Sequence, residues 1–415
     1  MNADRSGMLD AFRVPHFGAL WTSNLLHFFG LQVQLFTLQW LVTELTDSRT
    51  LIGAIISVQG ATVALFSPAA GVASDRLPRR NLLAFCRAGL SLLILLLALL
   101  VWSDRVALPH LYGFAMLLGM LMALSQPPSQ TFVFDIVGRG RTQNAVALNS
   151  AGIGLGQMAG PGLAGVLVAA IGVVGSWLSA AAGLGLAALL LARIPIAGHT
   201  GGIRRHPAQE LASGFRYVWR HPPLRLALLV CSMAFFNGAL AAMRPVFARH
   251  VLEVGSQGMG VMAASAGLGN LLGALFATRL PDFRRPGLAI TLGMLGFATS
   301  IVLYSLAFSL PYVLGVEFLA GVFAQLWQIS TFAGLQMAVS EEMRGRVMGL
   351  VFTTAQLAQV GGLFVGRLAD AIGDQAAMAT FGAIPVALLI LVLVFGRRSL
   401  AELGRDAPDE DRPSA

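Results

Sequence analysis

Long apolar stretches alternate with short polar ones along almost the whole chain, and this pattern sets the architecture. Each apolar stretch, wound as a helix, is long enough to cross roughly 30 Å of hydrocarbon. The pattern therefore predicts twelve membrane-spanning helices. They cover residues 17–43, 51–74, 82–103, 109–134, 143–171, 174–196, 223–248, 257–280, 286–308, 311–335, 346–372 and 376–396.

Only the connection after the sixth predicted span is long, and it divides the chain. The expected segments are a six-helix half at 1–196, a cytoplasmic linker at 197–222, a second six-helix half at 223–398 and a polar tail at 399–415. Thirteen residues from Gly160 share six identities with thirteen from Gly361, at matching places in the two halves. We therefore expect an all-α membrane protein of two pseudo-repeated halves, with the substrate path between them.

The linker contains one segment with helical spacing of apolar residues. Gln209–Trp219 (QELASGFRYVW) places its leucine, valine and large aromatic side chains near one face, with arginines around them. This pattern is typical of a short amphipathic helix on the membrane surface. A linker that is merely structured explains it equally well.

Composition and charge agree with a lipid environment. The chain is 56% hydrophobic and only 12% charged, about half the charged fraction of a soluble domain. All 28 basic residues are arginines scattered over short loops, which argues against nucleic-acid binding. Only five arginines lie on or near the side of the membrane opposite the N-terminus: Arg49, Arg105, Arg244, Arg249 and Arg367. The positive-inside rule then places both termini in the cytoplasm, at a bacterial inner membrane.

The strongest local motif lies between the second and third spans. Its members are Gly71, Asp75, Arg76, Arg79 and Arg80. Glycine permits close backbone approach, and arginines donate to carboxylates. The motif resembles the GxxxDRxxRR loop of the major facilitator superfamily, with Pro78 where glycine is usual. The resemblance implies a cytoplasmic lock in which Arg79 joins Asp75 to Asp135, at the end of the fourth span. The alternative is that the arginines only set topology.

The fifth span carries a ridge of small residues. It consists of Gly152, Gly156, Gly160, Pro161 and Gly165. The ridge resembles the antiporter motif of the superfamily, which marks exporters. Glycines let another helix approach closely, and the proline bends its own helix. We expect the ridge at the interface of the halves, where the eighth span offers Gly267, Gly269 and Gly273. Ordinary helix packing is the alternative.

Ionisable side chains inside the spans are the candidates for proton coupling. Glu317 in the tenth span is the only acid well inside, and Arg244 lies at a similar depth in the seventh. They form either a structural ion pair or a site where Glu317 exchanges a proton. His27 is a second candidate carrier, with hydrogen-bonded packing as its alternative role. The remaining acids lie near the outer ends of spans: Glu44, Asp47 and Asp370.

Amide side chains are the candidates for a substrate cavity, because the first span lines the cavity in the superfamily that the chain resembles. They are Asn24, Gln34, Asn237, Gln325, Gln328 and Gln356. No enzyme signature is present. The chain has no lysine and therefore no phosphate-binding loop with its lysine, so ATP-driven transport is excluded. No residue spacing fits a metal site, and no cofactor is expected.

Three further stretches resemble the branch of the superfamily that contains enterobactin-type siderophore exporters and macrolide efflux proteins. They are Gly214–Tyr217 together with Arg220–Pro222, Met243–Pro245, and Arg344–Leu350. The resemblance implies a monomeric, proton-coupled exporter of a small amphiphilic molecule, and a siderophore is the first candidate for that molecule. The alternatives are a macrolide or multidrug pump, a carrier of lysophospholipid or another solute, and a membrane sensor or scaffold that does not transport.

Overall fold

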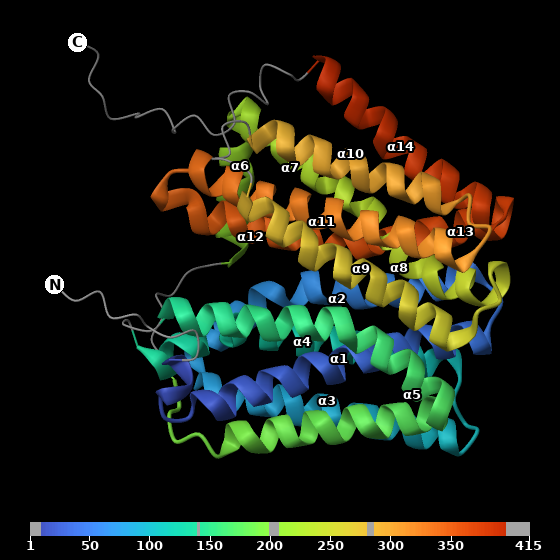
Figure 1. Ribbon diagram of the computed structural model, residues 1–415. Coiled ribbons are helices and arrows are strands. Elements are labelled where there is room, and N and C mark those ends of the chain that lie inside the picture. Colours follow the sequence, from blue (N-terminus) through green and yellow to red (C-terminus); the bar gives the residue numbers. More distant parts are fainter. Residues whose placement is uncertain (1–9, 139–141, 199–206, 280–285, 396–415) are drawn as a thin grey trace, which may run out of the picture. The chain divides into compact units, whose positions relative to one another are not determined.

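The computed structural model describes residues 10–138, 142–198, 207–279 and 286–395, which form helices without strands. The α-helices (Figure 1) are α1 (Phe17–Leu45), α2 (Arg49–Arg76), α3 (Arg79–Trp102), α4 (Leu108–Val137), α5 (Thr142–Ala192), α6 (Pro207–Arg220), α7 (Pro222–Ser232), α8 (Asn237–Val246), α9 (Gly255–Arg279), α10 (Pro286–Tyr304), α11 (Leu310–Ala338), α12 (Glu341–Leu357), α13 (Gly361–Ile372) and α14 (Asp374–Phe395). Short 3-10 or π-helical turns are η1 (Asp10–Arg13), η2 (Met233–Phe236), η3 (Phe247–Val251) and η4 (Ala358–Val360).

Eleven stretches of the described residues are long and apolar enough to cross a membrane. The longest, α5, makes two spans because Gly172 leaves helical geometry at φ 71° and ψ 178°, a conformation that costs glycine little. Two spans are built from pieces: α7, η2, α8 and η3 form Pro222–Val251, and α12, η4 and α13 form Glu342–Ile372. Twelve spans result, which confirms the predicted fold. The predicted ends lie within a few residues of the observed ones.

The chain groups into two compact units. Unit 1 contains Met1–Asp47, Val58–Arg204 and Pro245–Ala264, and unit 2 contains Ser48–Ser57, Arg205–Arg244 and Ser265–Ala415. The first residues of α2 thus pack with unit 2, while η3 and the start of α9 pack with unit 1. The predicted boundaries of halves and linker stay a prediction. The predicted linker contains helix α6, in which the rings of Phe215 and Trp219 stack with their centroids 5.4 Å apart.

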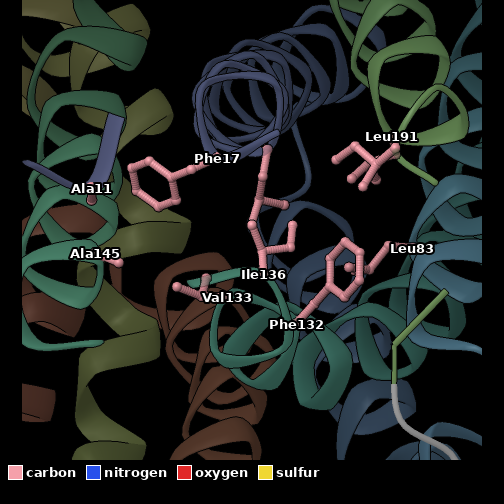
Figure 2. Close-up of a cluster of buried hydrophobic side chains, with 10 residues drawn as sticks. Ala11, Phe17, Leu83, Phe132, Val133, Ile136, Ala145 and Leu191 are labelled. Atoms are coloured by element: carbon pink, nitrogen blue, oxygen red, sulfur yellow. The ribbon is translucent and has the colours of Figure 1, made fainter. Parts of the chain in front are cut away.

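One buried cluster of unit 1 joins the ends of five elements. Its members include Ala11 of η1, Phe17 of α1, Leu83 of α3, Phe132 of α4 and Leu191 of α5 (Figure 2). Phe132 and Ile136 flank Asp135 on α4, and Leu83 follows Arg79 by one turn on α3. The cluster therefore fixes the two helix ends that carry Arg79 and Asp135.

Candidate functional site

Arg79 and Asp135 form an ion pair at this end of unit 1. Arg79, the first residue of α3, donates from Nη1 to Asp135 Oδ2 at 2.9 Å and to Oδ1 at 3.1 Å. Its neighbour Arg80 donates from Nη1 to the carbonyl of Ile194 at 2.8 Å, just beyond α5. The two arginines therefore hold the start of α3 against α4 and against the segment that follows α5.

The rest of the predicted lock lies on the last turns of α2, which ends at Arg76. The side chain of Asp75 lies outside the described residues, so its link to Arg79 stays a prediction. Arg76 is exposed. No described atom lies within 4 Å of the position that a Cβ would take at Gly71. The close backbone approach expected at that glycine stays a prediction.

We expect Asp135→Asn to slow transport several-fold while leaving the protein inserted. The neutral amide loses the charge-assisted bonds to Arg79, and a partly exposed pair of this kind contributes about 1 kcal/mol. The measurement is transport in membrane vesicles, normalised to the amount of protein in the membrane. The matched control is Asp104→Asn, the same change at an exposed loop position. The swapped pair, Arg79→Asp with Asp135→Arg, should regain part of the lost rate; a folded swap without any recovery contradicts the role of the pair.

The glycine ridge of α5 is buried and packs mainly on α1. A Cβ would lie 2.9 Å from Phe28 Cβ at Gly156 and 2.6 Å from Gln32 Cβ at Gly160. The end of the ridge meets α9: a Cβ at Gly165 would lie 2.6 Å from the carbonyl oxygen of Ser256 and 3.0 Å from Gly260 Cα, and a Cβ at Gly260 would lie 3.0 Å from the carbonyl oxygen of Pro161. These distances are too short for any side chain beyond hydrogen.

The expected partner of this ridge, the eighth span α9, is met only at the end of the ridge, whereas Gly156 and Gly160 pack on α1. Gly269 and Gly273 face α11, where their Cβ atoms would lie 2.1 Å from the carbonyl oxygen of Phe318 and 2.7 Å from that of Val322. A run of small residues predicts that a helix comes close, but it does not say which helix. At Gly160 the contact is with α1, inside the N-terminal half of the sequence.

Arg244 of α8 and Glu317 of α11 form a two-armed ion pair inside unit 2. Arg244 Nε donates to Glu317 Oε1 at 2.8 Å, and Nη2 donates to Oε2 at 3.0 Å. The Glu317 side chain is 0% exposed and that of Arg244 is 16% exposed. The structure thus brings the two predicted residues together, with both carboxylate oxygens engaged.

Asp370 of α13 caps the N-terminus of α2 within unit 2. Its carboxylate accepts hydrogen bonds from the backbone N–H of Arg49 and of Thr50 and from the hydroxyls of Ser48 and Thr50. Arg49 also pairs with Asp374 at 2.9 Å. Asp370 is therefore engaged as a helix cap, which satisfies backbone donors that the first turn leaves open.

The polar face of α1 is buried, and its amides differ in their partners. Asn24 donates from Nδ2 to Asn149 Oδ1 on α5 at 2.7 Å and accepts from Arg87 of α3. His27 Nδ1 and both amide atoms of Gln34 have no hydrogen-bond partner among the described residues. The two side chains are 7% and 0% exposed.

Arg87 is a buried polar residue that the arginine distribution alone does not single out, because most arginines of the chain set topology. It is 1% exposed and sits in the apolar run LLAFCRAGLSLL. Burying an arginine inside such a run is costly in a membrane, which makes it a candidate functional residue. Its position in an apolar run is therefore the feature of the sequence that points to it.

The predicted cavity amides of unit 2 are accessible. Asn237 and Gln328 are exposed, and Gln325 and Gln356 are half-buried. All four side chains therefore keep part of their surface exposed.

Solved structures share this fold. A POT family transporter in complex with a thioalcohol-conjugated peptide has a TM-score of 0.75 at 13% identity, over 92% of this chain and 96% of that one. The nucleoside transporter NupG has a TM-score of 0.74 at 14% identity, over 92% and 98%. A bacterial homolog of the human lysosomal transporter Spinster has a TM-score of 0.69 at 16% identity, over 96% and 98%.

Sequence comparison adds closer relatives. The Enterobactin exporter EntS of Shigella boydii serotype 4 is 28% identical over 376 residues, which make up 86% of this chain and 86% of that protein. EntS of Escherichia coli O139:H28 is 27% identical over the same shares. These relatives and neighbours are transporters rather than enzymes, as predicted. The model of the Major Facilitator Superfamily matches residues 20–362, and the chain is therefore a multi-pass membrane transporter that belongs to this superfamily.

Proposed function

We propose that the chain is a proton-coupled exporter of a small amphiphilic molecule, with a siderophore as the first candidate. The observation that carries the proposal is the similarity to the Enterobactin exporter EntS over 86% of both chains. The glycine ridge and Pro161 on α5, which resemble the antiporter motif, support export. The arginine distribution supports a bacterial inner membrane with both termini in the cytoplasm, and we propose a monomer.

In this proposal the buried pair of Arg244 and Glu317 couples protons to transport. Both carboxylate oxygens of Glu317 accept from Arg244. Protonation neutralises the carboxylate and removes the charge-assisted part of these bonds. Glu317 can therefore either pair with Arg244 or carry a proton, but not both. Binding of a proton would thus weaken the contact between α8 and α11. His27 is the second candidate carrier, and the accessible amides of unit 2 are the candidate substrate contacts.

The test is uptake of enterobactin into inside-out vesicles that contain the protein. A proton gradient should drive uptake, a protonophore should abolish it, and ATP without a gradient should not sustain it. Vesicles without the protein set the background. Uptake that survives the protonophore, or that ATP alone sustains, contradicts proton-coupled export.

A groove in unit 2 favours one second candidate, a lysophospholipid carrier. It has a volume of about 720 Å³ and lies between α7 and α14. Its lining is apolar apart from Ser232 and includes Leu229, Phe236 and Leu391. Such a groove suits an acyl chain. Transfer of a fluorescent lysophospholipid that ignores the protonophore, with no uptake of enterobactin, would favour this candidate.

A further inference from the structure

Arg87 carries a positive charge into the interior of unit 1. Its Nη1 donates to Ser23 Oγ, and its Nη2 donates to Asn24 Oδ1 at 2.6 Å. Among the described residues no carboxylate forms an ion pair with it, and its Nε has no hydrogen-bond partner. Burying a charge with neutral partners alone is costly. The contrast with Arg244, whose charge Glu317 neutralises, indicates that this charge has another use.

The two hydrogen bonds of Arg87 lead in different directions. The Ser23 hydroxyl donates its own hydrogen bond to the carbonyl of Ala187 on α5, so this arm ends on a backbone group. Asn24 leads instead to Asn149, which is half-buried. Only the second arm connects the buried charge to a side chain that is partly exposed.

The chemistry of the guanidinium fixes the direction of this second arm. A guanidinium only donates, so the oxygen of Asn24 must face Arg87 and its NH₂ group must face Asn149. Asn149 therefore accepts with its oxygen, and its own Nδ2 is left as a donor. Each donor in the row is polarised by the one before it. The row starts at a full positive charge and ends at the N–H groups of Asn149.

We propose that Asn149 is a substrate contact that takes an anionic oxygen, such as a catecholate or a carboxylate, and that Arg87 is the positioning residue behind it. The proposal rests on the function proposed above and deepens it by naming the chemical class of the substrate. His27, one turn after Asn24 on α1, adds a buried Nδ1 that has no hydrogen-bond partner among the described residues. An anion at Asn149 would also offset the uncompensated charge of Arg87.

The experiment measures binding of three probes to the purified full-length protein. They are enterobactin at mildly alkaline pH, where its catechol hydroxyls begin to ionise, the anionic dye carboxyfluorescein and the cationic dye ethidium. Asn149→Asp puts a carboxylate in place of the terminal donor. We expect it to weaken binding of both anionic probes about tenfold or more, while ethidium binds as before or tighter. A general loss of folding would weaken all three probes together.

Two further sets of variants separate positioning from structure. Asn144→Asp makes the same change on the same helix, where the side-chain oxygen accepts from the backbone N–H of Ala11, and it should leave all three affinities unchanged. Arg87→Gln removes the charge and should weaken the anionic probes. Arg87→Lys restores the charge and should regain part of that affinity.

The outcomes distinguish this proposal from the proposed function. If the wild-type protein exports enterobactin and Asn149→Asp binds both anions as well as the wild type does, the substrate contact is wrong and export stands. If the wild type ignores enterobactin but binds carboxyfluorescein in a way that depends on Asn149, the contact stands and the siderophore assignment falls. A wild type that binds neither anion overturns the contact.

Discussion

Glu317→Gln is expected to lower the free energy of unfolding by about 3–5 kcal/mol. The substitution leaves the Arg244 guanidinium, which is 16% exposed, with only a neutral amide for a partner. Titration of the detergent-solubilised protein with SDS measures the change. Glu44→Gln is the matched control, because it removes an exposed carboxylate at the end of α1.

A double variant separates the structural role of this pair from its role in coupling. Replacing both members, as Arg244→Met with Glu317→Leu, removes the unpaired charge and should restore most of the lost stability, since apolar replacements of buried ion pairs are often neutral. We expect this folded double variant to lose proton-driven uptake. If it transports like the wild type, the pair is only structural and His27 becomes the first candidate carrier.

Gly165→Leu is expected to abolish most export by forcing α5 and α9 apart. Its Cβ would lie 2.6 Å from the carbonyl oxygen of Ser256, and overpacking of this kind costs about 1–3 kcal/mol. If α5 and α9 meet there in only one transport state, the population of that state falls by about one to two decades. The measurement is cellular accumulation of enterobactin at matched expression.

The same helix provides the controls for Gly165→Leu. No described atom lies within 4 Å of a Cβ at Gly154, so Gly154→Leu should export normally. Gly160→Leu meets Gln32 of α1 instead, and we expect it to lower the amount of folded protein. Export at the wild-type rate by Gly165→Leu would mean that its contact with α9 is ordinary packing.

The helices could be predicted closely because the bilayer fixes the length of each span and the hydropathy pattern follows that length. Even the break at Gly172 lies in the two-residue gap between two predicted spans. An ion pair between Arg244 and Glu317 is one of the two roles that the sequence predicts for them, because opposite charges at similar depth in a membrane tend to pair.

Partners outside a residue's own helix were harder to predict. The glycines of α5 predict that another helix packs closely. The tight contact at Gly160 depends on the angle at which α1 crosses α5, and the sequence pattern does not give that angle. Asn24 was expected to offer its amide to a substrate, whereas both ends of that amide are taken by Arg87 and Asn149. Identifying that chain requires α1, α3 and α5 to be placed together.

The cap on α2 has a consequence for biosynthesis. The acceptor for the backbone N–H of Thr50 is a carboxylate 320 residues further along the chain. While the ribosome is still making the intervening spans, the backbone N–H groups of Arg49 and Thr50 must bind water or lipid headgroups instead. This end of α2 therefore completes its hydrogen bonding only after α13 has been inserted, which makes it one of the last parts of the protein to mature.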